Sequence, residues 1–280
     1  MPLPDFLIVG AMKCGTTTLQ AQLAAQPGVF MATPKEPNFF SDDDTYARGL
    51  DWYQGLFADA PSDALKGEAS THYTKLPTYP DCAARLTATL PDVRLVYLIR
   101  NPVARAISHF IHDWTMGLIS EPIDRACARY PELTSYSCYA RQIAPYVEAY
   151  GADRVLVVSL EEMEQHPQAV LERVCGFIGV PGPVVWREDL TRQNVSAERV
   201  RRFAFDWLLV RNPVAKALRR ALLPKRWRVA LKRRLQMRHR PDLPADMVSR
   251  LEHRFAQDHA ELRHMFPGLR LSASYPFVPE

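Results

Sequence analysis

The segment that most constrains the fold lies near the amino terminus, where the apolar run Phe6–Val9 leads into Gly10-Ala11-Met12-Lys13-Cys14-Gly15. Pro4-Asp5 and Gly10 bound the run, as is typical of a short buried strand. Thr16–Leu23 then has a helical pattern that ends near Pro27-Gly28. A strand, a glycine-bounded loop and a helix form the first half of an α/β unit, in which backbone amides at the helix start attract an anion.

The same alternation recurs along the first two thirds of the chain. Arg94–Ile99 and Val155–Val158 are continuous apolar runs, as expected for parallel strands covered on both faces. Asn101-Pro102 predicts a capped helix to about Met116, while an acidic turn at Glu161–Glu164 precedes a helix over Pro167–Ile178. We therefore predict an α/β fold, a P-loop-like parallel sheet flanked by helices, with ligand-binding residues at the carboxyl ends of the strands.

The last hundred residues differ from the rest in pattern and in charge. Beyond Gly182 the strand signal fades, and helices are expected from about Ala197, Pro213, Pro224 and Pro244. Residues 1–180 carry 14 basic and 21 acidic side chains, whereas residues 181–280 carry 21 basic and 10 acidic ones. We predict one domain over residues 1–280, in which 6–180 form a nucleotide-binding core and 181–280 a basic C-terminal helical cap.

The glycine loop has P-loop spacing but lacks the features of a nucleoside triphosphatase. Such a loop places lysine directly after the second glycine, where Thr16 stands here, and the lysine comes earlier as Lys13. Mg²⁺ would also need a carboxylate at a neighbouring strand end, but Arg100-Asn101 and Ser159-Leu160 follow the other two apolar strands. The pattern predicts phosphate bound by side-chain cations, without a metal.

Two motifs resemble those of sulfotransferases that use 3′-phosphoadenosine-5′-phosphosulfate (PAPS). Gly10–Leu19 resembles the family's 5′-phosphosulfate loop, G-x-x-K-x-G-T-T-x-L, and Arg100–Phe110 resembles its 3′-phosphate motif, R-[DN]-P-x-x-R-x-x-S-x-[YF]. The resemblance covers residues 6 to about 180 well and the remainder weakly. It implies in-line transfer of a sulfonate from PAPS to an acceptor hydroxyl or, less favoured, an amine, leaving adenosine 3′,5′-bisphosphate (PAP).

The resemblance also implies roles for individual residues. Lys13 would stabilise the charge that builds on the leaving phosphate. Loop amides and the hydroxyls of Thr16 and Thr17 would hold the 5′-phosphate, and Arg100 with Ser108 the 3′-phosphate, while Arg105 would support its own helix. The donor-binding residues expected on this basis are Lys13, Cys14, Gly15, Thr16, Thr17, Thr18, Arg100 and Ser108.

A candidate general base lies in Pro34–Phe40. This segment resembles K-E-P-H-F-F of bacterial members and E-x-x-F-F of the heparan-sulfate branch, where the glutamate is the base, here Glu36. Pro37 predicts extended backbone at Glu36, and the nearby Phe39 and Phe40 predict a desolvated carboxylate with a raised pKa. The alternative is a loop carboxylate paired with Lys35.

One family motif is matched only in part. Gly67–Tyr73 resembles E-K-[ST]-P-x-Y, but Ala69 replaces the lysine that helps at the sulfonate in heparan-type enzymes. Lys35 or Lys75 could substitute, or Lys13 could act alone. Glu68 and His72 remain alternative bases within the same stretch.

The basic C-terminal third has four interpretations: a lid over the donor, a cleft for an acidic glycan, a membrane-surface patch, or a nucleic-acid contact that lacks a recognisable motif. By resemblance, Arg192 or Arg199 would reach the 3′-phosphate. Carbohydrate, lipid, peptide and secondary-metabolite acceptors all stay open. Two further hypotheses are a Mg-ATP-dependent P-loop phosphotransferase and a membrane- or polyanion-binding protein with a degenerate nucleotide pocket.

Cysteine usage and hydropathy bear on the compartment. The five cysteines are widely spaced, without a Cys-x-x-Cys pair, which favours a reducing environment. There is no apolar run of membrane-spanning length and no signal-like amino terminus, so we expect a cytoplasmic location.

Overall fold

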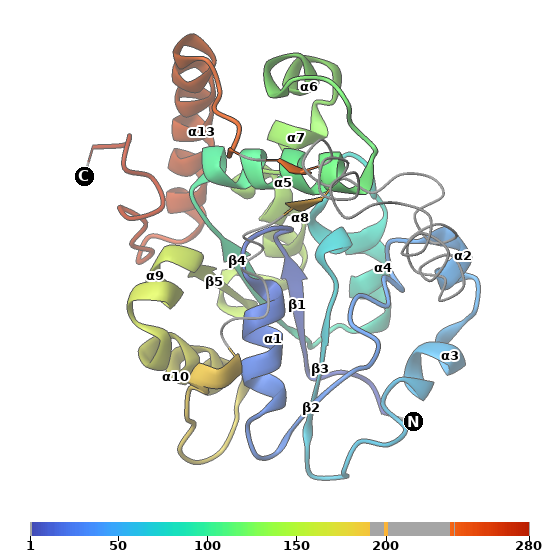
Figure 1. The fold of residues 1–280 in the computed structure, drawn as a ribbon. Helices are drawn as coiled ribbons and strands as arrows, with labels where there is room; N and C mark the ends of the chain where they lie inside the picture. Colours follow the sequence, from blue (N-terminus) through green and yellow to red (C-terminus); the bar gives the residue numbers. More distant parts are fainter. Residues whose placement is uncertain (1, 191–198, 201–235, 238, 280) are drawn as a thin grey trace, which may run out of the picture.

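β1, Phe6–Gly10, lies at the centre of a five-stranded sheet with the order β2-β3-β1-β4-β5. The computed structural model describes residues 2–190, 199–200, 236–237 and 239–279 (Figure 1). All four strand pairings are parallel, which confirms the predicted fold class. The other strands are β2 Val29–Met31, β3 Leu65–Ala69, β4 Arg94–Ile99 and β5 Val155–Ser159.

Helices cover both faces of the sheet. α1, Thr16–Ala24, and α10, Pro167–Ile178, pack together on one face, and α4, Cys82–Thr89, and α8, Tyr139–Tyr150, on the other (Figure 1). α5, Pro102–Met116, lies across the carboxyl end of the strands. The smaller elements are α2 Asp43–Tyr46, α3 Leu50–Gly55, η1 Thr71–Thr74, α6 Ile123–Arg129, α7 Glu132–Ser135, η2 Ala152–Arg154, α9 Leu160–Gln165, η3 Glu188–Leu190, β6 Arg199–Val200 and β7 Gln236–Met237.

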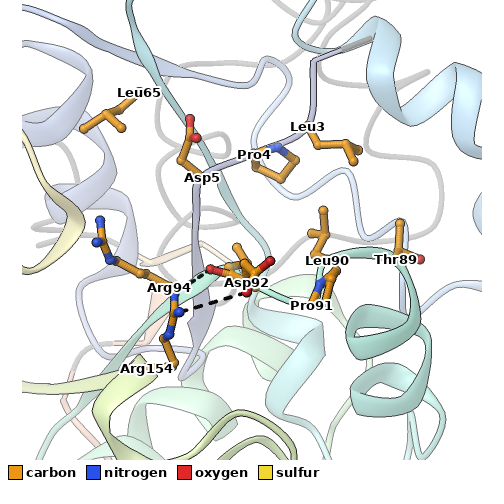
Figure 2. Close-up of a pocket in the computed structure, with 11 residues that line it drawn as sticks. Leu3, Pro4, Asp5, Leu65, Thr89, Leu90, Pro91, Asp92, Arg94 and Arg154 are labelled. Carbon is orange, nitrogen blue, oxygen red and sulfur yellow. Dashed lines mark hydrogen bonds and ion pairs between the residues drawn. The ribbon is translucent and has the colours of Figure 1, made fainter.

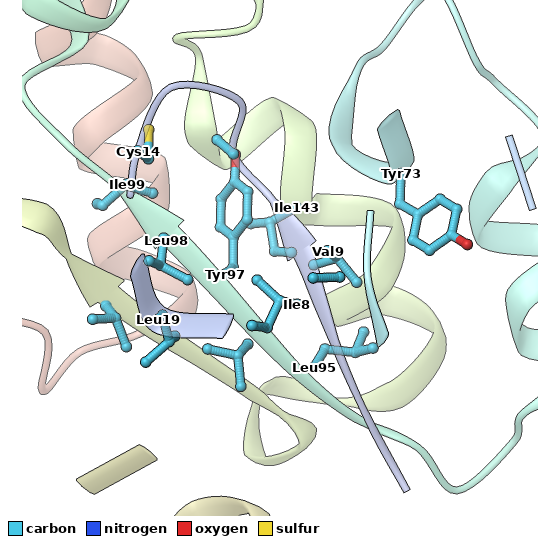
Figure 3. Close-up of a cluster of buried hydrophobic side chains, with 14 of the residues drawn as sticks. Ile8, Val9, Cys14, Leu19, Tyr73, Leu95, Tyr97, Leu98, Ile99 and Ile143 are labelled. Carbon is cyan, nitrogen blue, oxygen red and sulfur yellow. The ribbon is translucent and has the colours of Figure 1, made fainter. Parts of the chain in front are cut away.

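The core lies between the two helical layers. Every residue of Phe6–Val9 is fully buried, as is every residue of Leu95–Ile99. Figure 3 shows side chains of β1 and β4 packed between α1, which contributes Leu19, and α8, which contributes Ile143. Continuous burial on both strand faces explains why these strands have unbroken apolar sequences.

Two local predictions for the core are wrong. The acidic segment Glu161–Glu164 is not a turn but part of α9, because the Ser159 hydroxyl accepts a hydrogen bond from the Glu162 amide and caps the helix. Arg105 does not support its own helix. Its buried guanidinium donates to Ser137 Oγ and to the Leu133 carbonyl, and so ties α5 to the α7 region.

The C-terminal helix α13, Ala245–Met265, confirms the helix predicted after Pro244. It packs on α8 and α5, and the Asp258 carboxylate accepts hydrogen bonds from the amides of Ala140 and Arg141 in the first turn of α8. The predicted helix starts at Ala197, Pro213 and Pro224 lie outside the described residues. Among the helices that are described, none combines the length and apolar character needed to cross a lipid bilayer.

Gly67 of β3 offers a test of the packing at the sheet centre. A Cβ added there would lie 2.2 Å from the Phe6 ring, so Gly67→Ala is expected to lower the free energy of unfolding by about 1–3 kcal/mol. Gly176, inside α10, is the matched control because nothing lies within 4 Å of its added Cβ. Gly176→Ala should raise stability by about 0.5–1 kcal/mol through helix propensity. Urea unfolding followed by circular dichroism measures both, and equal effects would contradict the packing at Phe6.

Candidate active site

The loop between β1 and α1 has the backbone geometry expected of an anion-binding turn. The Ala11 amide donates to the Leu98 carbonyl at 2.7 Å, which holds the loop against β4. Lys13 and Gly15 have positive φ angles of 70° and 89°, so the chain curls before the helix begins. The first helical hydrogen bond runs from the Leu19 amide to the Gly15 carbonyl, and the amides of residues 16–18 therefore precede the helical ladder. These amides and the helix dipole favour an anion at this point.

The two motif glycines are required by close neighbours. A Cβ on Gly10 would lie 1.9 Å from Thr74 Oγ1, the hydroxyl that donates to the Val9 carbonyl at 2.9 Å. A Cβ on Gly15 would lie 2.8 Å from a Leu160 methyl group. The first glycine therefore lets η1 approach the end of β1, and the second lets α9 pack against the loop.

The predicted loop residues contribute in different ways. The Cys14 thiol points into the core, 3.6 Å from the Tyr139 hydroxyl, and burial raises its pKa to about 11. Cys14 can therefore offer a ligand its backbone but not a reactive thiolate. Thr16 is buried, whereas Thr17 and Thr18 are half-buried along the first turn of α1.

Arg100 connects the two predicted donor motifs. Its guanidinium donates to the Lys13 carbonyl at 3.3 Å, so the residue that follows β4 reaches the loop that follows β1. Its Nε is buried and has no hydrogen-bond partner within the described part of the chain, so the guanidinium is only partly satisfied there. Asn101 caps α5 as predicted, since its Oδ1 accepts from the Ala104 amide at 2.8 Å, and Ser108 is half-buried two turns further along. These donors fit a nucleotide with an anion at each end.

Glu161, for which no role was predicted, connects the end of β5 to the start of α5. Its carboxylate accepts hydrogen bonds from the Asn101 amide at 2.8 Å and from the hydroxyls of Ser274 and Ser159 at 2.7 and 3.1 Å. The carboxylate at the end of β5 is therefore engaged in anchoring the start of α5. Ser274 lies more than a hundred residues away in sequence, so no local pattern could have revealed the contact.

The predicted base Glu36 lies beside the end of β3. Its amide donates to the Ala69 carbonyl at 3.0 Å, and its Oε1 accepts from Lys35 Nζ at 2.7 Å and from Thr71 Oγ1 at 3.3 Å. The backbone is not extended as predicted, because Glu36 has a φ angle of 58°. In this left-handed conformation the Glu36 amide is hydrogen-bonded to the last residue of β3.

The prediction of a raised pKa for Glu36 is also wrong. Burial does raise its pKa, but the adjacent Lys35 ammonium, with Lys75 and His72, outweighs burial and holds the pKa below its usual value. The rings of Phe39 and Phe40 both pack on Tyr53 in the core. Glu36 is consequently ionised at neutral pH.

The two alternative bases have different environments. Glu68 is fully buried, accepts hydrogen bonds from the Tyr53 and Tyr73 hydroxyls at 2.6 and 3.1 Å, and has a pKa raised by burial. This carboxyl group holds the aromatic cluster together, away from solvent. The His72 ring stacks on Tyr79, and burial together with the Lys75 charge lowers its pKa to about 4.

Two further titratable residues, Lys75 and Asp113, lie close enough to interact with Glu36 or Lys13. Lys75 is 9% exposed, and burial lowers its pKa to about 8 against the opposing effect of Glu36 and Asp113. Asp113 of α5 lies 3.3 Å from His109 Nε2, and burial raises its pKa to about 6 despite the attraction of Lys75 and Lys13. Asp113 was missed at the sequence level because only the fold turns this face of α5 toward Lys13.

The basic C-terminal third reaches α5 through Arg240. The Arg240 guanidinium donates to the Ala104 carbonyl at 3.4 Å, one helical turn before Ser108. The predicted contacts from Arg192 and Arg199 cannot be placed, because Arg192 and the side chain of Arg199 lie outside the described residues.

A separate cavity of about 350 Å³ lies at the opposite edge of the sheet (Figure 2). Its cations are engaged within the protein: Arg154 donates to the Asp92 carbonyl at 2.9 Å, and Arg94 donates to the Ile178 carbonyl at 2.8 Å. The predicted donor residues instead gather at the carboxyl edge, where ligands bind in open parallel sheets.

Comparison with known proteins identifies the family. The sulfotransferase domain profile matches residues 3–240. This chain belongs to the sulfotransferase domain family. Membership indicates an enzyme of the PAPS-dependent sulfotransferase class, as the two donor motifs implied.

The family contains curated relatives and solved structures. The chain is 32% identical over 194 residues to heparan sulfate glucosamine 3-O-sulfotransferase 3B1 of Mus musculus, covering 64% of this chain and 46% of that protein. It is 28% identical over 202 residues to bifunctional heparan sulfate N-deacetylase/N-sulfotransferase 2 of Bos taurus, covering 64% of this chain and 22% of that protein. The matched region thus spans less than half of either relative. A sulfotransferase from Alicyclobacillus acidocaldarius shares the fold, with a TM-score of 0.70, 24% identity and coverage of 98% and 99%.

The ion pair of Glu36 yields a prediction about its protonation. Replacing Lys35 by methionine removes the main cause that lowers the Glu36 pKa, so burial should move that pKa upward. Carboxyl carbon chemical shifts followed by NMR across a pH titration measure the change. Lys66→Met is the control, because the Lys66 ammonium donates to the Ala64 carbonyl near the amino end of β3, whereas Glu36 lies at the carboxyl end, and it should leave the Glu36 pKa unchanged. An unchanged pKa in Lys35→Met would contradict the assigned cause.

Proposed function

We propose that this chain transfers a sulfonate group from PAPS to an acceptor hydroxyl or amine, and that the Lys13 loop and Arg100 together bind the donor. The observation that carries the proposal is the hydrogen bond from the Arg100 guanidinium to the Lys13 carbonyl, because it joins the two donor motifs in one place. When bound, PAPS supplies an activated sulfonate on a phosphate leaving group. The remaining chemistry depends on the residues of this chain.

The donor-binding residues divide between the two anionic ends of the nucleotide. The amides at the start of α1, with the Thr16 and Thr17 hydroxyls, hold the 5′ end. The Lys13 ammonium stabilises negative charge on the leaving phosphate oxygen. Arg100 and Ser108 hold the 3′-phosphate, where the unpartnered Arg100 Nε supplies a charge-assisted donor.

Glu36 accepts the proton of the acceptor group. Within the described residues both hydrogen bonds to its carboxylate end on Oε1, so Oε2 remains available to the acceptor. A carboxylate that is already ionised can take the proton as the acceptor oxygen or nitrogen attacks. Lys35 orients the carboxylate through Oε1 and sets its basicity.

The acceptor we propose is a glycan or a small molecule that carries anionic groups. Two relatives are named for action on heparan sulfate, one at an oxygen and one at a nitrogen, which supports this class of acceptor. The excess of basic residues in 181–280 supports an anionic partner as well. We assign this region to the same domain as the core, because α13 packs on α8 and α5.

Nucleotide binding tests the donor site without knowledge of the acceptor. By isothermal calorimetry, PAP should bind without Mg²⁺ and more tightly than ATP. Arg100→Met should weaken PAP binding by about 10-fold to 100-fold, since it removes a charge-assisted contact, and should weaken binding of adenosine 5′-phosphosulfate, which lacks the 3′-phosphate, by less. A preference for ATP that requires Mg²⁺ would instead support the phosphotransferase hypothesis and refute sulfonate transfer.

The assignment of Glu36 is tested by the isosteric change Glu36→Gln. A screen of acceptor classes with isotope-labelled PAPS, scored by mass gain, first identifies a working acceptor. With that acceptor, Glu36→Gln should lower kcat by about 100-fold or more because the proton acceptor is lost. The Kd of PAP should not change, since Glu36 does not contact the nucleotide. Transfer at the wild-type rate would remove Glu36 as the base.

A further inference from the structure

β3 ends in alanine, where the related motif has a lysine. Ala69 is the last residue of β3, is 2% exposed, and stands where the partly matched motif E-K-[ST]-P-x-Y has lysine. The adjacent Ser70 is also fully buried. No side chain at the Ala69 position can therefore bring positive charge to the end of β3, next to the Lys13 loop.

Lys75, six residues later, is held close to that loop from both sides. The Thr74 hydroxyl donates to the carbonyl of Val9, the residue before Gly10, at 2.9 Å. The Leu76 amide donates to Gln142 Oε1 at 2.6 Å, and Gln142 Nε2 donates back to the Leu76 carbonyl at 3.0 Å. The backbone around Lys75 is thus attached to β1 on one side and to α8 on the other, which fixes the origin of its side chain.

The surroundings of Lys75 are those of a cation placed to meet an anion. It interacts electrostatically with two carboxylates, Glu36 and Asp113, and Asp113 also interacts with Lys13. Both carboxylates act on Lys75 through space, and within the described part of the chain neither is hydrogen-bonded to its ammonium. The cationic or titratable neighbours from the packed elements are Lys35, His72, Arg105 and His109.

We propose that Lys75 is a catalytic residue that contacts the sulfonate of PAPS beside Lys13 and replaces the cation absent at Ala69. This inference rests on the proposed function and names a residue of the same site. The other candidate is Lys35, whose ammonium lies 2.7 Å from the Glu36 carboxylate and is therefore already paired with a negative charge. Lys75 is 9% exposed and forms no ion pair with a described residue, so it gains more from an arriving anion than Lys35, which is already paired.

The buried position of Lys75 couples donor binding to protonation. Burial lowers the Lys75 pKa to about 8 in the free protein, so above pH 8 most molecules carry a neutral amine there. A sulfonate against Nζ favours the ammonium form and raises the pKa. Binding of PAPS at pH 8 to 9 should therefore take up a proton, whereas PAP, which lacks the sulfonate, should take up less.

The discriminating experiment compares PAPS with PAP, which differ only in the sulfonate, in the absence of acceptor. Lys75→Met should weaken PAPS binding by about 10-fold to 100-fold and leave PAP within about 2-fold. Lys75→Arg, which keeps the charge, should recover most of the PAPS affinity. Lys66→Met, a lysine of β3 whose ammonium donates to the Ala64 carbonyl, is the matched control and should change neither affinity.

Calorimetry at pH 8.5 in buffers of different ionisation enthalpy gives a second readout that does not need the methionine variant. Wild-type protein should take up more protons with PAPS than with PAP, and Lys75→Arg should abolish the difference because arginine is protonated in both states.

Loss of PAP and PAPS affinity in equal measure, or unchanged PAPS binding in Lys75→Met, would overturn the role of Lys75. Selective PAPS loss in Lys35→Met alone would assign the role to Lys35 instead. Failure of wild-type protein to bind PAP would refute the proposed function itself.

Discussion

The site depends on one structural constraint, the meeting of the Lys13 loop with Arg100 at the carboxyl edge of a parallel sheet. Adjacent parallel strands end at the same edge, so residues that follow β1 and β4 become neighbours although nearly ninety positions separate them. The loop can curl there only because Gly10 and Gly15 leave room for Thr74 and Leu160. Backbone amides, a lysine and an arginine thereby converge before any ligand arrives.

Electrostatic balance is the second property of this edge. Lys13, Lys35, Lys75 and Arg100 bring positive charge, and two partly buried carboxylates, Glu36 and Asp113, offset part of it. Buried charges of one sign cost free energy in the absence of a counter-charge, and an anionic nucleotide supplies that counter-charge. Burial raises the pKa of both carboxylates and neighbouring lysines lower it, but the balance differs. At Glu36 the lysines prevail and hold the pKa low, whereas at Asp113 burial prevails and raises the pKa to about 6.

Elements with a strong local pattern could be predicted, and elements stabilised by distant partners could not. β1, β4 and β5 contain unbroken apolar runs, Phe6–Val9, Leu95–Ile99 and Val155–Val158, because both faces of the sheet are covered. β3 escaped prediction because its sequence, Leu-Lys-Gly-Glu-Ala, has weak strand propensity, and its glutamate is buried only with the help of Tyr53 and Tyr73. α9 was mistaken for a turn because the role of Ser159 as helix cap depends on β5 ending at that residue, and the sequence pattern did not mark that boundary.

The sequence by itself predicts the outline of a donor site. Two glycines, a lysine between them and an arginine after the second apolar strand are recognisable there because backbone geometry and charge are local properties. The state of Glu36, the burial of Lys75 and the position of Asp113 depend on the folded molecule. Their pKa values arise from burial and from charges contributed by separate elements, and such distances exist only after the sheet has brought those elements together.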